Sequence, residues 1–205
     1  MDPRTSASLD AYDKAAVEYQ EFWRQRRPLD AVRKFAALAT KGATVLDPAC
    51  GPVLDVRLLR DAGLRVVGGD ISHEVMKLGK MLFPKGALAR WDLHTLPFLD
   101  ATFGGIWAPA ALQHLPRSGM LTALRELRRV HREGPIFLTF REGSGDLEPA
   151  EDPPAGDVYV SSVTADELKA LLLGVGYTEV EVEQRPDPLD RRDITLLYGW
   201  GRLKP

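Results

Sequence analysis

The sequence predicts an α/β fold in which helices cover a mostly parallel sheet. Short apolar segments alternate along the chain with segments whose apolar residues recur at helical spacing, as in β–α units with buried parallel strands. The last two apolar segments are separated only by the Pro-, Asp- and Arg-rich residues 185–193, so they can pair as a hairpin. We therefore expect this pair to bring an antiparallel strand into the sheet.

The predicted elements follow one another closely from residue 44 onward. The apolar segments predicted as parallel strands are 44–47, 65–70, 86–92, 103–108 and 135–140, and the closing strands are 177–183 and 194–202. The helices predicted between them are 54–62, 73–82, 117–131 and 164–176. Ser72 is a suitable N-cap for the second helix, and Thr164 with Glu167 forms a capping-box pattern at the last.

The first 40 residues are expected to form helices that precede the sheet. One helical face is marked by residues at three- and four-residue steps, which are Tyr12, Ala16, Tyr19 and Trp23. Pro28 suits the first turn of a further helix over about 28–39. We treat residues 1–205 as one domain, with 1–40 as an N-terminal segment and 41–205 as the core.

Residues 143–157 (GSGDLEPAEDPPAGD) interrupt this pattern. They combine Gly, Pro and acidic residues and show no periodicity, so we predict a loop. Such a loop could close over a pocket as a lid or serve as a solvated linker. The composition favours the linker.

Composition narrows the classes of function. A net charge of −2 gives no sign of a nucleic-acid or membrane partner. The single cysteine, Cys50, excludes an intrachain disulfide, and four scattered histidines show no metal-ligand spacing. The N-terminus has no apolar signal-like segment, so a cytoplasmic protein is expected. Nothing in the sequence indicates the oligomeric state.

Three acidic residues lie at the ends of successive strands, where ligands bind in such sheets: Asp47 ends the first, Asp70 ends the second and Asp92 follows the third. Asp70 lies 23 residues after Asp47, close to the spacing at which an acid accepts both ribose hydroxyls. Asp92, after the third strand, could accept a hydrogen bond from the exocyclic amine of a base. Asp47 could hold a cation or brace the turn. Together they indicate a nucleoside site at this edge of the sheet.

The motif series resembles that of the class I S-adenosylmethionine-dependent methyltransferases. The segments that carry the resemblance are VLDPACGPV, VVGGDIS, ARWDLHTLPF, FGGIWAPAALQHLP and ELRRVHREGPIFLTF, and AYDKAAVEY resembles the lid helix of that superfamily. The resemblance runs from about residue 10 to the end and is nearest to the small bacterial enzymes of the ubiquinone/menaquinone-biosynthesis and tellurite-resistance type. It implies a Rossmann-like, doubly wound, seven-stranded sheet in the order 3-2-1-4-5-7-6, with strand 7 antiparallel.

The resemblance also implies residues for S-adenosylmethionine. Asp47 and the turn Ala49, Cys50 and Gly51 would approach its methionine end. Its ribose would bind to Asp70 with Ile71 against the adenine, and Asp92 and Leu93 would lie near the adenine ring. The sulfonium would be flanked by Trp107 and Ala108, with Tyr12 and Tyr19 contributed by the lid.

Two departures from the usual acid-x-Gly-x-Gly-x-Gly turn raise an alternative. Ala49 replaces the first Gly and Val53 the third, and Leu54 makes the turn unusually apolar. Val is strongly disfavoured if position 53 needs a positive φ, and tolerable if it already belongs to the helix. The first hypothesis is therefore an active methyltransferase acting on a small molecule. The second is a methyltransferase fold that binds or regulates without methylating.

His114 is the candidate general base, because a neutral imidazole can take a proton near neutral pH. The alternative is a histidine that packs against or caps the following helix. Arg141 and Glu142 follow the fifth strand and could recognise a charged acceptor, or could be exposed loop charges. Cys50 lies near a helix N-terminus that could lower its pKa, although packing is the better interpretation.

Overall fold

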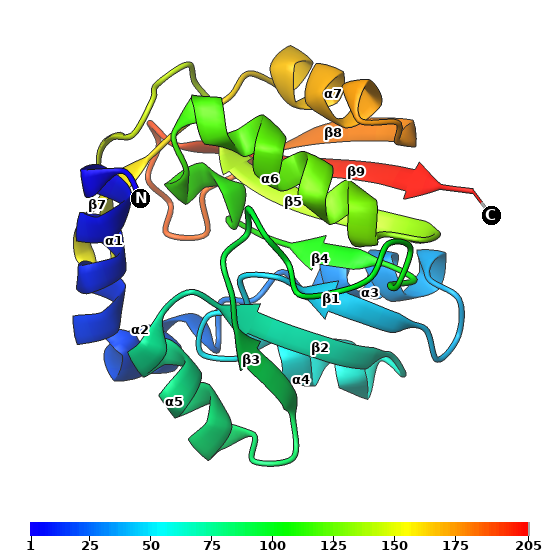
Figure 1. The fold of residues 1–205 in the computed structure, drawn as a ribbon. Coiled ribbons are helices and arrows are strands. Elements are labelled where there is room, and N and C mark those ends of the chain that lie inside the picture. The colour runs from blue at the N-terminus through cyan, green and yellow to red at the C-terminus, as the bar shows by residue number, and fades with distance from the viewer. Residues whose placement is uncertain (205) are drawn as a thin grey trace.

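The computed structural model describes residues 1–204 and contains one seven-stranded sheet in the order β3-β2-β1-β4-β5-β9-β8 (Figure 1). Its strands are β1 (Thr44–Asp47), β2 (Arg65–Asp70), β3 (Ala87–Arg90), β4 (Ile106–Ala108), β5 (Gly134–Arg141), β8 (Thr178–Pro186) and β9 (Thr195–Leu203). Strands β1 to β5 are parallel, and β9 runs antiparallel to both of its neighbours. The predicted strand order and the antiparallel closing strand are confirmed.

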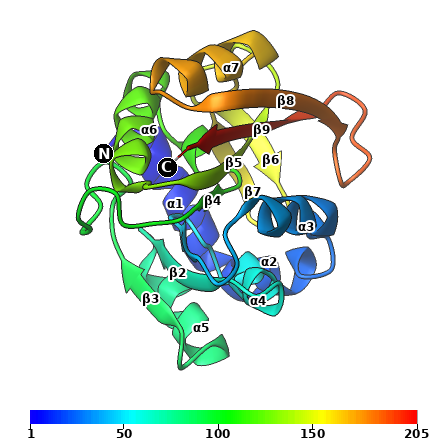
Figure 2. The same ribbon diagram turned by 90° about the vertical axis from the view of Figure 1, so that its right-hand side faces the viewer.

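Helices cover both faces of this sheet, as the two ribbon views show (Figures 1 and 2). They are α1 (Pro3–Lys14), α2 (Ala16–Trp23), α3 (Leu29–Leu38), α4 (Leu54–Asp61), α5 (His73–Leu82), α6 (Arg117–Val130) and α7 (Ala165–Gly174). One buried cluster joins α6 and α7 to the sheet, and a second joins α3, α4 and α5 to the opposite face. Each apolar helix face is therefore buried against strands, which explains why helical periodicity predicted the helices within about two residues.

The predicted helix starts are also confirmed. Ser72 accepts a hydrogen bond from the Val75 N–H at 2.9 Å, which makes it the N-cap of α5. Thr164 and Glu167 form the reciprocal capping box of α7, with each side chain accepting from the other's backbone N–H. Both caps satisfy N–H groups that the first helical turn leaves unpaired.

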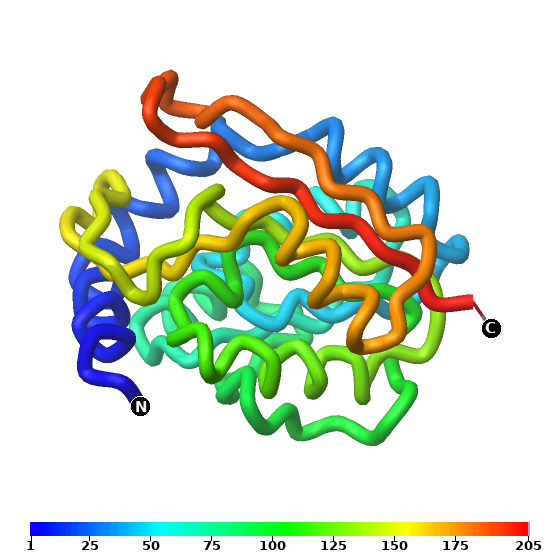
Figure 3. Tube along the Cα trace, turned by 90° about the horizontal axis from the view of Figure 1, so that it is seen from above, coloured from blue at the N-terminus to red at the C-terminus, as the bar shows by residue number. Residues whose placement is uncertain are grey.

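The prediction of a loop over residues 143–157 is wrong. This part of the chain forms a separate hairpin of β6 (Glu148–Asp152) and β7 (Gly156–Val160). The hairpin packs against α1, and Figure 3 shows the two segments side by side at one end of the molecule. Pro and acidic residues have low strand propensity, so the sequence does not predict these strands, which are stabilised by a distant helix.

The parallel strands place their carboxyl ends beneath α1. In Figure 1 the arrow of β4 points toward α1, whereas β9 points away from it. Within residues 1–204, no helix is both long and apolar enough to cross a bilayer. The edge of the sheet covered by α1, α2 and the hairpin is where ligands bind in this class of sheet.

Candidate functional site

A cavity of about 760 Å³ lies at the carboxyl ends of the parallel strands. Its volume is within the range of pockets that hold small-molecule ligands. Its lining includes most of the predicted site residues, namely Tyr12, Tyr19, Asp47, Ala49, Cys50, Gly51, Asp70, Ile71, Asp92, Leu93 and His114. Residues from six parts of the chain thus meet in one space.

The first turn and the second strand are joined by Asp70. The backbone N–H groups of Gly51 and Ser72 each donate to one Asp70 oxygen, both at 3.0 Å. Gly51 has a φ of 52°, a conformation that glycine adopts without a steric cost. Burial raises the pKa of Asp70, and the N–H donors oppose that rise. Each carboxylate oxygen has a second acceptor site, so Asp70 can still bind two hydroxyls.

Asp47 is buried without full pairing. Its side chain is 2% exposed, and Oδ1 has no hydrogen-bond partner among the described residues. Burial raises the pKa of Asp47 well above its usual range, and the negative charge of Asp55 raises it further. A buried oxygen without a donor is uncommon in proteins and calls for an explanation such as a ligand.

A buried ion pair beside Asp47 was not predicted from the sequence. Arg27 donates to both oxygens of Asp55, at 2.7 and 2.5 Å, and the Trp107 indole N–H donates to Asp55 at 2.9 Å. Arg27 lies between two helices, and Asp55 is in the first turn of α4. They are 28 residues apart, and no local spacing signals their contact.

The predicted positions of Trp107 and Ala108 at the sulfonium are not borne out by the cavity lining. Trp107 is fully buried, stacks on Phe137 at 4.4 Å between ring centroids, and faces the core. Strand β4 ends at Ala108, and the cavity is lined instead by the next three residues, 109–111. The ring lies in the core cluster, and only its N–H reaches toward the site, where it donates to the cavity-lining Asp55.

Val53 is a turn residue, not a helical one. It has φ 55° and ψ 32° and precedes the first residue of α4. Its side chain is 9% exposed and belongs to the core cluster under α4 and α5, whereas its neighbours Pro52 and Leu54 line the cavity. Val53 therefore strains the backbone without narrowing the cavity.

The roof of the cavity is built by two tyrosines and an acid from the hairpin. The Tyr12 hydroxyl donates to Asp152 at 2.7 Å, and the Tyr19 hydroxyl donates to the same oxygen at 3.4 Å. The two rings meet edge to face with centroids 5.3 Å apart. Burial, followed by the charge of Asp152, raises the pKa of both phenols, so they remain donors.

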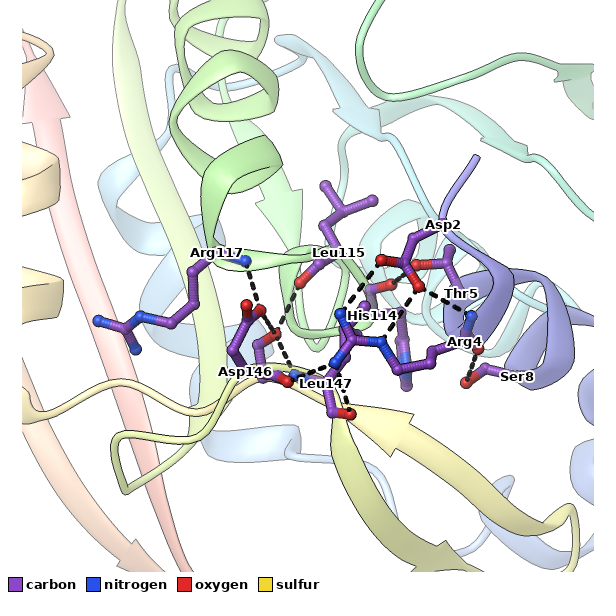
Figure 4. A network of polar contacts seen from close by, with 10 residues as sticks. Asp2, Arg4, Thr5, Ser8, His114, Leu115, Arg117, Asp146 and Leu147 are labelled. Carbon is purple, nitrogen blue, oxygen red and sulfur yellow. Dashed lines mark hydrogen bonds and ion pairs between the residues drawn. The ribbon is translucent and has the colours of Figure 1, made fainter.

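The hairpin is tied to α1 and α2 by further hydrogen bonds. The Tyr159 N–H donates to Ser8 Oγ at 2.8 Å, and the Trp23 indole donates to the Pro153 carbonyl at 2.8 Å. Figure 4 shows Arg4 reaching the carbonyls of Asp146 and Leu147 at the base of the hairpin. The solvated-linker interpretation is therefore wrong, because the segment covers the cavity.

His114 faces the roof from a 3₁₀ turn (Leu112–His114) that follows β4. Its Nδ1 lies 3.3 Å from the Tyr159 carbonyl oxygen, and its Nε2 lies 3.4 Å from the Tyr12 hydroxyl. A carbonyl only accepts, so Nδ1 carries the proton and Nε2 keeps its lone pair. Burial lowers the pKa of His114, and the imidazole is therefore neutral near pH 7.

Asp92, the third acid, lies at the exposed edge of the cavity. Asp92 is exposed and bonds to the backbone N–H and Nδ1 of His94, at 2.8 and 2.7 Å. Partial burial opposes the effect of these contacts, which together lower the pKa of Asp92.

Burial raises the pKa of Cys50, which argues against a thiolate nucleophile. Within residues 1–204, no group of three or more His, Cys, Asp or Glu side chains is arranged to hold a metal ion.

The chain is similar to known methyltransferases in sequence and in fold. Residues 46–139 match the family model described as "Methyltransferase domain". A malonyl-[acyl-carrier protein] O-methyltransferase from Erwinia billingiae is 28% identical over 80% of this chain and 57% of its own length. A probable S-adenosylmethionine-dependent methyltransferase from Mycolicibacterium smegmatis is 26% identical over 79% of this chain and 61% of its own length. The chain thus spans about three fifths of these relatives.

A solved structure extends the likeness to the complete fold. It is the 1,6-didemethyltoxoflavin-N1-methyltransferase of Burkholderia thailandensis with bound 1,6-didemethyltoxoflavin and S-adenosylhomocysteine. It superposes with a TM-score of 0.74, covering 100% of this chain and 92% of that one, at 20% sequence identity. At this identity the likeness concerns the fold alone.

Proposed function

Because the chain belongs to the class I S-adenosylmethionine-dependent methyltransferase superfamily, we propose that it transfers a methyl group from S-adenosylmethionine to a small-molecule acceptor. One observation carries the proposal. The unpartnered oxygen of buried Asp47 lines the same cavity as Asp70, whose carboxylate retains acceptor sites for hydroxyls.

The residues on the β1–β3 side suit the groups of this cofactor. Asp47 would accept from its ammonium group, which removes the orphaned oxygen. Asp70 would bind the ribose hydroxyls, with Ile71 against the adenine. Asp92 and Leu93 would lie at the adenine edge, where the Asp92 carboxylate already contacts the His94 imidazole. When bound, the cofactor supplies a methyl group already activated by its sulfonium.

His114 would act on the acceptor. Its Nε2 lone pair is free because Nδ1 donates to the Tyr159 carbonyl, and Nε2 can take a proton from an acceptor hydroxyl or amine. Tyr12 and Tyr19 would close the cavity and exclude water from the reacting groups. The base therefore needs no ionised partner to hold the correct tautomer.

The alternative of a fold that has lost methyl transfer rested on the altered turn. Val53 points into the core and leaves the cavity open, so that argument loses its main support. The named relatives differ in acceptor: one name specifies malonyl-[acyl-carrier protein] and the other 1,6-didemethyltoxoflavin. These names therefore do not specify one acceptor for this chain.

Isothermal titration with S-adenosylhomocysteine tests the proposal. We expect saturable binding to one site, weakened about tenfold or more by Asp70→Asn, since bonds to a charged group contribute about 1.5–3 kcal/mol. Asp61→Asn, at the exposed end of α4, is the matched control and should bind as the wild type does. No heat of binding at millimolar ligand to the folded protein would exclude the proposal.

A further inference from the structure

Arg141 is a cation in the cavity without a carboxylate partner. It lies at the carboxyl end of β5, is partly buried and lines the cavity. Its only side-chain hydrogen bond within residues 1–204 is from Nη2 to the Glu151 carbonyl, at 2.8 Å. A guanidinium has five N–H donors, so most of those of Arg141 remain available.

Two other arginines of the cavity are neutralised by carboxylates, whereas Arg26, which also lines it, is exposed and lies over the Phe22 ring. Arg27 forms the bidentate pair with Asp55, and Arg191 donates to both oxygens of Asp187, at 2.7 and 2.9 Å. Arg191 also donates to the Glu151 carbonyl at 3.0 Å, so two guanidinium groups converge on one oxygen. Of these two, only Arg191 has a carboxylate.

Asp152 does not supply the missing partner. Its Oδ2 accepts from the Tyr12 and Tyr19 hydroxyls, and within the described chain no cation lies within 4.0 Å of its carboxylate. The Asp152 carboxylate is thus used by the two roof tyrosines, and Arg141 lines the same cavity without pairing with it. A partly buried cation is normally paired with an anion, and within residues 1–204 Arg141 has only the hydrogen bond to the Glu151 carbonyl.

The sheet order separates this cation from the nucleoside residues. Asp47 and Asp70 end β1 and β2, whereas Arg141 pairs in register with Leu196 of β9 on the far side of β4. Both Leu196 and Tyr198 of β9 line the cavity. His114 follows β4, between the nucleoside residues and Arg141. Burial lowers the pKa of His114, and the positive charge of Arg141 lowers it further.

We infer that the methyl acceptor is a small organic acid whose carboxylate binds to Arg141. The inference rests on the proposed function, since it places the acceptor across β4 from the cofactor residues. The carboxylate would take the free donors of Arg141 in the forked geometry that guanidinium groups favour. This would direct the remainder of the acceptor toward His114, with Leu196 and Tyr198 against its apolar part.

Matched probe pairs test this assignment. The protein is first saturated with S-adenosylhomocysteine, whose binding is measured separately. Benzoate and benzamide, and succinate and succinamide, are then titrated and followed by ligand-observed NMR. We expect each carboxylate to bind more tightly than its neutral amide, and Arg141→Gln to reduce carboxylate affinity about tenfold or more. Arg192→Gln, an exposed residue outside the cavity, should change nothing.

The outcomes separate the two proposals. If S-adenosylhomocysteine does not bind, the proposed function fails. The inference is tested when S-adenosylhomocysteine binds with equal affinity to the wild type and to Arg141→Gln. In that case the inference is overturned if the wild type does not prefer carboxylates to amides, or if Arg141→Gln keeps that preference. Should Arg141→Gln fail to fold, Arg141→Lys replaces it, and an affinity for carboxylates equal to that of the wild type contradicts the forked contact.

Discussion

Val53 packs its side chain toward Gly79 of α5 while its own backbone is left-handed. A Cβ atom added at Gly79 would lie 3.1 Å from Val53 Cγ1, so the space that residue 79 leaves empty is what accommodates the valine. This contact in the core, on the side away from the cavity, offsets the strain of the left-handed turn. The unusual residue in the turn and the glycine in the helix form one structural unit.

Replacing Val53 by Gly should leave cofactor affinity within about threefold of the wild type, because the side chain does not line the cavity. The left-handed strain of about 1–2 kcal/mol would be relieved, but burial of the valine, about 1.5 kcal/mol or more, would be lost. Isothermal titration and chemical denaturation of both proteins measure the two effects.

The contrasting substitution is Gly51→Val, two residues away and lining the cavity. It adds a β-branched side chain at a φ of 52° and should weaken binding of S-adenosylhomocysteine by more than tenfold. If Val53→Gly changes the affinity as much as Gly51→Val does, the placement of Val53 outside the site is wrong.

Asp47 should give the free protein a stability that falls as the pH rises. Burial raises the pKa of Asp47, so above about pH 4 the native state keeps a proton that the unfolded chain has lost. The free energy of unfolding then decreases with increasing pH, by at most about 1.4 kcal/mol per pH unit, until the native carboxyl ionises. Asp47→Asn removes this dependence because an amide does not titrate.

Urea denaturation of both proteins at a series of pH values measures the difference. The stability of the wild type relative to Asp47→Asn should decline from about pH 4 upward. Parallel pH profiles for the wild type and Asp47→Asn would mean that Asp47 ionises normally.

His114 should be neutral near pH 7, with its proton on Nδ1. Burial lowers the pKa of His114 below the ordinary value of about 6.5, and the Tyr159 carbonyl fixes the tautomer. Nitrogen-detected NMR of labelled protein reports both properties, and His114→Gln assigns the signals. A proton on Nε2, or a pKa above 6.5, would remove His114 as the base.

Ser8 should control the local opening of the hairpin. Ser8→Ala removes the acceptor of the Tyr159 N–H, a contact of about 1 kcal/mol, and should raise hydrogen exchange at that amide roughly fivefold. Ser6→Ala, in the same helix and without a side-chain hydrogen bond within residues 1–204, is the control. Unchanged exchange at Tyr159 in Ser8→Ala would show that the hairpin is held independently of α1.

The sequence predicted the sheet well because buried parallel strands and amphipathic helices leave periodic signals. It also indicated Asp47, Asp70 and Asp92, since acids that end neighbouring parallel strands must lie at one edge. The roof could not be predicted in this way. Asp152 lies 140 residues from Tyr12, in a segment of strand-disfavouring residues whose pairing depends on α1.

The turn shows a second limit of the sequence. Whether Val53 is a turn or a helical residue depends on the space beside Gly79, which is set by how α4 and α5 pack. In the same way, the resemblance to the methyltransferases implied that Trp107 lies at the site. Its indole instead donates to Asp55, whose own position depends on Arg27.

A crystal structure of the protein with S-adenosylhomocysteine would show directly whether the cavity holds the cofactor as proposed. We expect the ligand ammonium within hydrogen-bond distance of Asp47 Oδ1, the ribose hydroxyls on Asp70, and the sulfur directed toward the space between His114 and Arg141. A ligand bound in the reverse orientation, or outside the cavity with Asp47 Oδ1 still unpartnered, would contradict this expectation.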